Sequence, residues 1–546
     1  MTTILKIGAV LIIIAVAVNI FLLRNNKINL SDFTRVQIPI AQDIANLPEA
    51  KPFESEPVAL QDGDVFDMSI TPVKKNINGQ WVRMLGYNGS VPGPALRIPQ
   101  GAQITVRLTN NGDIATTLHS HGVRMENAFD GVPDVTQKAI EPGETFEYKL
   151  KFPDAGVFWY HPHVRTDYTL ESGLYGNYIV TPTDTAYWLP ANREVPIILD
   201  DIAMDKSGLL PFSKDTTDHT LMGRFGNVMF TNGETGFRPN AKQGEVVRLY
   251  FTNAANTRVF NVAIPGAKMK LVGADLGRYA QEKFTDEVMI APGERRVVDV
   301  LFEKAGAYQL IHKTPGKSHT LETIAVSDEN VTTSYAQEFN TLRHNASVGE
   351  ETNALMDTYL SKAPDKKLSL ELDMSGAAQG MMNSAGGGHM GGGHMMSNGS
   401  MMSGADMGMG DDGDAIEWED TMSAMNSQTT AKMMTWRLTD DATKKSNMDV
   451  KDWKFKVGDK VKIRIFNDPK SAHPMQHPIH FHGQRFLVLS TNGVKNDNPV
   501  WQDTTLILKG DTVDILLETS NPGVWMAHCH ILEHAESGMM IPFTVE

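Results

Sequence analysis

The amino-acid sequence predicts an all-β protein of three β-sandwich domains behind an apolar N-terminal segment. The chain has 546 residues, enough for three domains of ordinary size. Its apolar runs are short and rich in β-branched residues. Residues 103–108 and 460–465 alternate polar and apolar side chains, as half-buried strands do. Pro-Gly turn signals recur between such runs, and sustained helical periodicity is almost absent beyond the N-terminus. Short strands at this spacing indicate β-sandwiches.

Residues 1–27 form a candidate membrane anchor or signal peptide. Lys6 precedes an apolar run from Ile7 to Leu23, whose 17 residues are at the short limit for a membrane-spanning helix. Cleavage after Ala15-Val16-Ala17 is the alternative, because small residues of this kind mark signal-peptide sites. We expect an uncleaved helical anchor with the rest of the chain outside the cytoplasm.

The three predicted domains differ in their histidine content. The first, residues 55–185, contains His119-Ser120-His121 and His161-Pro162-His163. The second, residues 186–345, has similar strand patterns but no clustered histidines, so we expect its role to be structural. The third, residues 360–546, contains His477-Pro478-Ile479-His480-Phe481-His482 and the C-terminal run.

A Met/Gly-rich insert at residues 374–430 interrupts the third domain. It separates predicted strands at 368–372 and 434–438, and 14 of the 29 methionines lie between Met374 and Met434. Glycine at this density does not support a packed element, so we expect disorder. The insert is either a flexible linker or a Cu(I)-capturing segment, since thioethers are soft ligands that prefer Cu(I). Candidate ligands in it are Met390, Met395 and Met396.

The C-terminal run His528-Cys529-His530, followed by His534 and Met539, contains the only cysteine of the chain. Two histidines, one cysteine and a weak axial methionine are the ligands of a blue copper site. Side chains alternate faces along a strand. If Cys529 points toward one copper ion, His528 and His530 therefore point the other way, toward a second metal centre.

The upstream histidines supply ligands for that second centre. Together with His528 and His530 they make eight imidazoles: His119, His121, His161, His163, His480 and His482 are the other six. Imidazole suits copper, zinc, iron and nickel, so the rings alone do not select the metal. The neighbouring Cys529 motif selects copper.

The four histidine segments resemble the four copper-binding signatures of the multicopper oxidases, the family of laccases, bilirubin oxidases and bacterial copper-efflux oxidases. The resemblance extends from about residue 55 to the C-terminus and includes Asn88-Gly89-Ser90-Val91-Pro92-Gly93-Pro94. It implies three cupredoxin-like Greek-key domains and four copper ions, one type 1, one type 2 and two type 3. By motif position the implied ligands are His477, Cys529, His534 and axial Met539 for type 1; His119 and His480 for type 2; and His121, His161, His530 with His163, His482, His528 for the type 3 pair.

The same resemblance implies the reaction. A reductant gives single electrons to the type 1 copper, and the trinuclear cluster reduces dioxygen to two waters. Asp130 matches an acid that delivers protons in similar bacterial enzymes. Many relatives also have a glutamate directly after the last type 1 histidine, where this chain has Ala535. Either Glu536, Asp134 or Glu171 substitutes for it, or the proton relay follows a different route.

The expected reductant is Cu(I), with phenols or other small organic donors as secondary substrates. The Met-rich insert resembles that of the copper-efflux oxidases, and Met475 matches a substrate-copper ligand there. His473 stands where that subfamily has an aspartate.

The net charge of −15 suits cationic substrates and argues against nucleic acid as a partner. A single cysteine excludes an intramolecular disulfide.

Two other functions are considered. A copper-storage protein leaves the paired histidines unexplained, and a copper nitrite reductase lacks the trinuclear ligand set. The sequence does not predict the oligomeric state.

Overall fold

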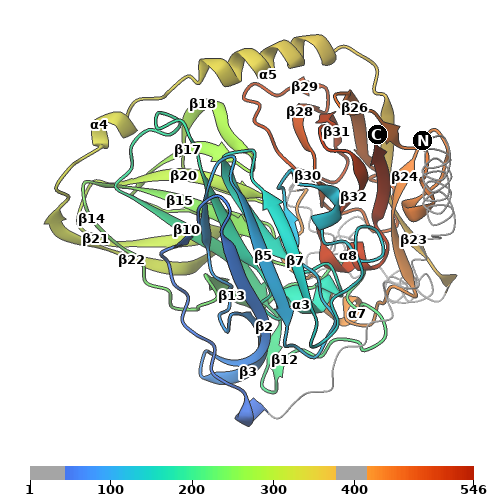
Figure 1. The fold of residues 1–546 in the computed structure, drawn as a ribbon, viewed down its shortest axis with the longest axis horizontal. Helices are drawn as coiled ribbons and strands as arrows, with labels where there is room; N and C mark the ends of the chain where they lie inside the picture. The colour runs from blue at the N-terminus through green and yellow to red at the C-terminus, as the bar shows by residue number, and fades with distance from the viewer. Residues whose placement is uncertain (1–43, 377–414) are drawn as a thin grey trace, which may run out of the picture.

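The computed structural model describes residues 44–376 and 415–546 (Figure 1). The predicted N-terminal helix and the candidate ligands Met390, Met395 and Met396 lie outside these residues. Within the described ranges no helix is both long enough and apolar enough to cross a membrane.

The described residues form three pairs of β-sheets, one pair after another along the chain. Each pair is a β-sandwich, and the three are called the first, second and third sandwich. The first pair contains β1 (Val58–Ala59), β4 (Leu96–Pro99), β9 (Gly176–Thr181), β8 (Gly156–His161) and β6 (His119–His121) in one sheet, and β3 (Gln80–Tyr87), β2 (Val65–Ile77), β5 (Gln103–Asn110) and β7 (Thr145–Lys151) in the other. Apolar residues of both sheets, such as Val106 and Phe158, meet in one buried core.

The second pair also encloses its own core, with Leu249 and Val262 from opposite sheets. One sheet contains β13 (Val228–Thr231), β10 (Arg193–Ile202), β15 (Glu245–Asn253), β20 (Arg295–Phe302), β17 (Lys268–Ala274) and β18 (Gly277–Thr285); the other contains β14 (Asn240–Gln243), β22 (Ser318–Asn330), β21 (Gly306–Lys313), β16 (Phe260–Ala263) and β19 (Val288–Ile290). A small hairpin, β11 (Met204–Asp205) and β12 (Gly208–Leu209), precedes β13.

The third pair holds the C-terminal motif in its core, where Cys529 and Met539 lie among apolar side chains. One sheet contains β24 (Met434–Asp440), β23 (Lys366–Met374), β26 (Lys460–Asn467), β31 (Thr512–Glu518), β28 (Arg485–Thr491) and β29 (Val494–Lys495); the other contains β25 (Lys454–Phe455), β33 (Met540–Val545), β32 (Gly523–Cys529), β27 (His477–Phe481) and β30 (Thr504–Ile507).

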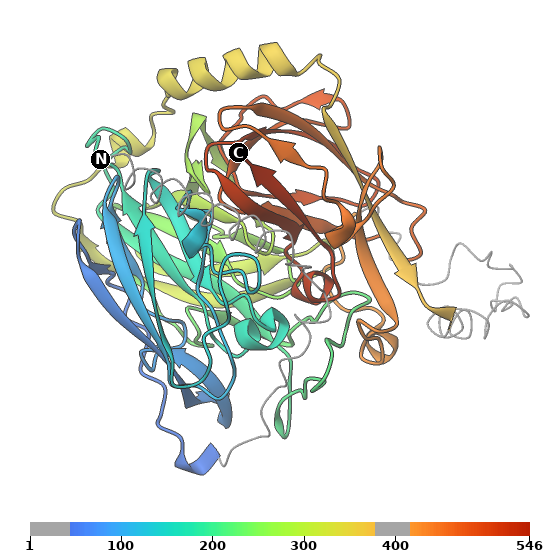
Figure 2. The ribbon, with the colours of Figure 1, turned by 45° about the vertical axis from the view of Figure 1, so that its right-hand side comes forward.

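The first and third sandwiches lie side by side although they are far apart in sequence. In Figures 1 and 2 the orange-to-red strands stand next to the blue-to-teal ones. Hydrogen bonds join them: Asn127 donates to the carbonyl of Val524 at 2.7 Å, and Arg124 donates to Ser520 at 3.0 Å. Ligands from both ends of the chain can therefore meet at this contact.

The predicted strands are present with the expected burial pattern. Residues 103–110 form β5, in which exposed or half-buried positions alternate with buried ones. The predicted strands at 368–372 and 434–438 lie within β23 and β24, which pair antiparallel. The all-β prediction is confirmed for the described residues.

The longest described helix was not predicted from the sequence. Helix α5 (Ala346–Tyr359) runs along the top of both views and contacts β18 and β28 (Figures 1 and 2). Thr352 and Met356 are its only buried residues, so it lacks the broad apolar stripe that marks a helix in sequence. The buried Lys462 ammonium donates to the carbonyls of Tyr359 and Leu360, which satisfies acceptors at the helix C-terminus.

The remaining helices are short and connect the sheets: α3 (Thr166–Glu171), α4 (Ala336–Phe339), α7 (Ser423–Asn426), α8 (Leu532–Glu536) and the 3-10 turns Ile44–Asn46, Asn127–Phe129 and Asn447–Asp449. Helix α7 lies inside the predicted insert 374–430. Its Asn426 donates to the carbonyl of Gly223 at 2.8 Å, and Ile416 is buried. The last part of the insert, from residue 415, is therefore folded against the body.

Candidate metal centre

A first cluster of ligand atoms joins β27, β32 and α8 in the third sandwich. His477 begins β27, Cys529 ends β32 and His534 lies in α8; all three side chains are fully buried. The Cys529 sulfur lies 3.5 Å from Nδ1 of His477 and 3.9 Å from Nδ1 of His534, and the two nitrogens are 3.4 Å apart. The Trp436 ring stacks on His534 with centroids 4.3 Å apart, which fixes that imidazole.

These spacings fit one shared transition-metal ion. Nitrogen and sulfur ligands lie about 2.0–2.3 Å from such ions, so two of them on one ion are roughly 3.3–3.9 Å apart. Burial raises the pKa of the Cys529 thiol, so metal binding must displace its proton. Met539, also fully buried, is in the same core.

The residues on either side of Cys529 belong to a second cluster, as strand alternation predicts. His528 lies with its ring centroid 5.3 Å from that of His163, and His530 lies 5.5 Å from His161. The main chain around Cys529 therefore joins the two clusters directly.

The second cluster contains eight buried histidines from the first and third sandwiches. β6 pairs with β8, which aligns His119 with His161, and β27 pairs with β32, which aligns His480 with His528. Their ligand atoms converge in three groups: His119, His121, His480; His121, His161, His530; and His163, His482, His528. The last two groups are the sets expected for the type 3 pair.

Most of these rings are held by one nitrogen and present the other inward. Nδ1 is the nitrogen that has an oxygen partner in His119, His161, His480, His482 and His528. In His121 the oxygen partners of Nε2 are Asp503 and Thr504. Nε2 of His119, His161, His163 and His480 and Nδ1 of His121 have no hydrogen-bond partner among the described residues, as expected of atoms that face a metal.

Burial also keeps the rings in the form that binds metals. It lowers the pKa of His163 to about 3, with the nearby His119 adding to the shift, and lowers the pKa of His477 to about 3. A neutral imidazole has a free lone pair, whereas an imidazolium has none. Nε2 of His482 and Nε2 of His528 face each other at 3.0 Å, a spacing that suits two ligands of one ion.

Asp130 ties the cluster together from the loop after β6. Its carboxylate accepts a hydrogen bond from Nδ1 of His482 at 2.9 Å, and its carbonyl accepts one from Nδ1 of His119 at 2.7 Å. Burial alone would raise the pKa of Asp130, but His482 and His119 hold it well below its usual value. It is therefore an ionised acceptor that orients both rings.

Three sequence models described as multicopper oxidase match residues 69–185, 204–340 and 419–546, one on each sandwich. The chain belongs to the multicopper oxidase family. Such oxidases use one type 1, one type 2 and two type 3 copper ions, and the two histidine clusters fit this set.

Similar proteins cover nearly the whole oxidase. Multicopper oxidase mco of Staphylococcus aureus is 26% identical over 85% of this chain and 84% of that protein. A copper resistance protein A homolog of Pseudomonas syringae pv. tomato is 24% identical over 91% and 95%. The solved multicopper oxidase of Campylobacter jejuni, described as a metallo-oxidase, has a TM-score of 0.67 and 23% identity over 94% of this chain and 99% of that one. The likeness to this structure shows the fold.

The remaining residues predicted from the sequence are three acids and Met475, and their surroundings differ from one another. Glu536 accepts hydrogen bonds from the backbone N–H and hydroxyl of Thr166, at 2.8 and 2.7 Å. Glu171 is buried against Arg224, and Asp134 is exposed. Met475 is buried in the core that contains Cys529.

Asp503 and Glu533 were not predicted from the sequence. Asp503 contacts His121 directly at 2.9 Å, and Glu533 is a buried acid next to His534. Burial raises the pKa of Glu533 to about 8. The only local sequence feature that could have identified Asp503 is its place directly before the strand Thr504-Thr505-Leu506-Ile507. No local feature identifies Glu533, because its burial results from the tertiary fold.

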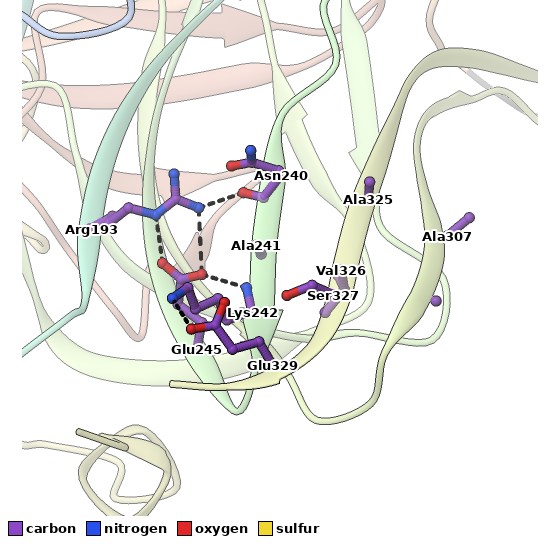
Figure 3. Close-up of a pocket in the computed structure, with 11 residues that line it drawn as sticks. Arg193, Asn240, Ala241, Lys242, Glu245, Ala307, Ala325, Val326, Ser327 and Glu329 are labelled. Atoms are coloured by element: carbon purple, nitrogen blue, oxygen red, sulfur yellow. Dashed lines mark hydrogen bonds and ion pairs between the residues drawn. The ribbon is translucent and has the colours of Figure 1, made fainter. Parts of the chain in front are cut away.

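The cavity shown in Figure 3 lies in the second sandwich and has no histidine in its lining. It measures ≈ 730 Å³. In its lining Arg193 pairs with Glu245, and Lys242 pairs with Glu329 at 2.7 Å (Figure 3). Its charges neutralise each other, so it offers no ligand chemistry related to copper.

Proposed function

We propose that this protein oxidises Cu(I), and secondarily phenols, while reducing dioxygen to water outside the cytoplasm. The observation that supports it most directly is the place of Cys529. Its sulfur faces His477 and His534, while His528 and His530 on either side face the eight-histidine cluster.

In this proposal His477, Cys529 and His534, together with Met539 of the same core, would hold the type 1 copper. His119 and His480 hold the type 2 ion, and the groups His121, His161, His530 and His163, His482, His528 hold the type 3 pair. Bound copper supplies one-electron transfer at the first cluster and dioxygen reduction at the second. The protein supplies the connection: beside the covalent path, Nδ1 of His528 donates to the carbonyl of Cys529 at 2.8 Å.

Proton delivery is assigned to acids around the second cluster. Asp130 is the first of them because its carboxylate reaches His482 at 2.9 Å. Glu536 is the second; it binds Thr166, three residues after His163, and so supports the loop that presents that ring. Burial raises the pKa of Glu536 to about 7 against the opposing charge of Arg165, which keeps a proton available near neutral pH.

The choice of Cu(I) rests on charge and on soft ligands. The net charge of −15 attracts cations. Methionine thioethers, which are abundant in the Met/Gly-rich insert, are ligands that prefer Cu(I). Met475 and the buried His473 lie just before His477, and Nε2 of His473 has no partner among the described residues. A relative named for copper resistance supports the same role, and the apolar segment from Ile7 to Leu23 supports an extracytoplasmic location.

Copper content and oxygen uptake test the function. We expect about four copper ions per chain, blue absorption and oxygen consumption with Cu(I) as donor. Cys529→Ser should abolish the blue absorption and the oxidase activity together while the histidine cluster still binds copper. Blue absorption that survived the substitution would refute the type 1 assignment. A copper-loaded protein without oxygen uptake would favour storage instead.

A further inference from the structure

The second sandwich provides a buried arginine to the edge of the histidine cluster. Arg295, the first residue of β20, is fully buried, and its guanidinium donates to both carboxylate oxygens of Asp503, at 2.7 Å through Nη1. Asp503 directly precedes β30 of the third sandwich and is also fully buried. Two parallel hydrogen bonds between guanidinium and carboxylate fix both distance and orientation.

Asp503 in turn holds two histidines. Its carboxylate accepts a hydrogen bond from Nε2 of His121 at 2.9 Å, and its carbonyl accepts one from Nδ1 of His480 at 3.0 Å. Both carboxylate oxygens of Asp503 accept hydrogen bonds from Arg295, so toward His121 the carboxylate is again the acceptor and Nε2 of His121 is the donor. The lone pair of His121 is then on Nδ1, which has no partner among the described residues.

This orientation distinguishes His121 from the five anchored rings that are held through Nδ1. We propose that Arg295 is a positioning residue for the trinuclear copper cluster, acting through Asp503 to present Nδ1 of His121 to the metal. The proposal rests on the proposed function, because it needs copper at the eight histidines. It also gives the second sandwich a part in the site, beyond the structural role expected from its lack of clustered histidines.

The Arg295–Asp503 pair packs closely against the backbone of Gly122. A Cβ added at Gly122, which has φ +81°, would lie 2.3 Å from Asp503 Oδ2 and 2.5 Å from Arg295 Nη2. The Arg295 Nε also donates to the carbonyl of Val157 at 3.0 Å in β8. The guanidinium thus contacts all three sandwiches, and its hydrogen bonds determine where Asp503 can lie.

The test compares Arg295→Met and Arg295→Lys with the wild-type protein, each loaded with copper. The readouts are copper content and electron paramagnetic resonance, which separates type 1, type 2 and uncoupled type 3 copper. We expect Arg295→Met to weaken binding at the trinuclear positions about 10–100-fold, as loss of a supporting hydrogen-bond partner does, while type 1 copper stays. Arg295→Lys should recover part of the loss, because lysine restores the charge but not the paired hydrogen bonds.

Arg248→Met is the matched control. Arg248 in β15 makes an equally buried two-bond pair with Asp299 of β20, at 2.8 and 2.9 Å, away from the histidines. It should leave the copper signals unchanged. Equal loss of trinuclear copper in Arg248→Met, or full copper with unchanged resonance in Arg295→Met, would overturn the proposal.

Asp503→Asn covers the case in which Arg295→Met does not fold. Asparagine has nearly the same shape but no charge, so it should alter the type 2 and type 3 signals and spare type 1. Unchanged signals in this variant would also overturn the proposal. If the wild-type protein itself bound no trinuclear copper, the proposed function would fail, and that result is distinguishable because it needs no variant.

Discussion

Asp130 of the first sandwich accepts a hydrogen bond from Nδ1 of His482 of the third, 352 residues later in the chain, at 2.9 Å. Both side chains are buried. The bond spans the contact between the two sandwiches, so it couples their packing to the orientation of a cluster histidine.

Removal of this carboxylate should therefore impair the second cluster. We expect Asp130→Ala to lower turnover or trinuclear copper affinity about 10–100-fold, as loss of such hydrogen bonds commonly does. Type 1 absorption should persist, because Cys529 and its partners lie in a separate cluster. Oxygen consumption and copper content are the measurements. Glu147→Ala, an exposed acid of the same sandwich, is the control.

Asp130→Asn separates positioning from proton transfer. An asparagine oxygen can still accept from His482, but an amide does not carry a proton at neutral pH. Full copper with slow turnover would assign proton transfer to Asp130. Normal copper and normal turnover would remove it from the relay.

The sequence was sufficient for residues whose chemistry is rare. A single cysteine between two histidines, with three more histidine segments upstream, has few uses other than copper. The alternation of side chains along a strand then predicted that Cys529 faces one metal site and that His528 and His530 face another. Asp503 and Arg295 could not be found this way, because they are 208 residues apart and ordinary in type. Helix α5 was missed because most of its surface is exposed.

The buried amide of Asn256 links two acids that sequence reasoning could not place together. Its Nδ2 lies 2.9 Å from Glu533 and 3.4 Å from Glu171, and it donates to the carbonyl of Asp167 at 3.0 Å. Asn256→Ala removes one donor from each of these buried acceptors, so we expect a loss of about 1–3 kcal/mol in the free energy of unfolding.

Thermal and denaturant midpoints measure this loss. Asn340→Ala is a suitable control, because Asn340 is exposed and bonds only its own helix, at the carbonyl of Ala336. A midpoint of Asn256→Ala equal to that of the wild type would show that water replaces the amide without cost.

Glu322 of β22 should make stability depend on pH. Burial raises the pKa of Glu322 to about 8, above its unfolded value of 4.5. The folded state therefore holds a proton that the unfolded state has lost, so stability is full below about pH 4.5 and falls as pH rises toward 8. Glu322→Gln has no proton to lose, and its advantage in free energy of unfolding over the wild type should grow across this range, to at most about 5 kcal/mol.

Unfolding midpoints at pH 5 and pH 9 check this difference. Glu303→Gln, an exposed glutamate of the same sandwich, should show little change with pH relative to the wild type. An advantage of Glu322→Gln that is the same at both pH values would mean that the carboxyl is ionised in the folded protein throughout.

The Met-rich stretch, residues 377–414 of the Met/Gly-rich insert, should increase the efficiency of Cu(I) oxidation and leave the oxidation of organic donors unchanged. Because Ile416 and Asn426 are packed against the body, the deletion that isolates the stretch is residues 377–414 and not the whole predicted insert. We expect this deletion to lower kcat/KM for Cu(I) by about tenfold or more at low copper, since soft thioethers concentrate Cu(I). Phenol turnover should be unaffected.

A variant with the methionines of 377–414 replaced by serine keeps the length of the stretch and removes its thioethers. If thioethers capture Cu(I), this variant behaves like the deletion. If it keeps wild-type Cu(I) oxidation at low copper while the deletion does not, the stretch acts through its length or its histidines. Should both variants oxidise Cu(I) normally, the stretch is a linker, and His473 and Met475, which precede His477, become the next candidates for Cu(I) binding.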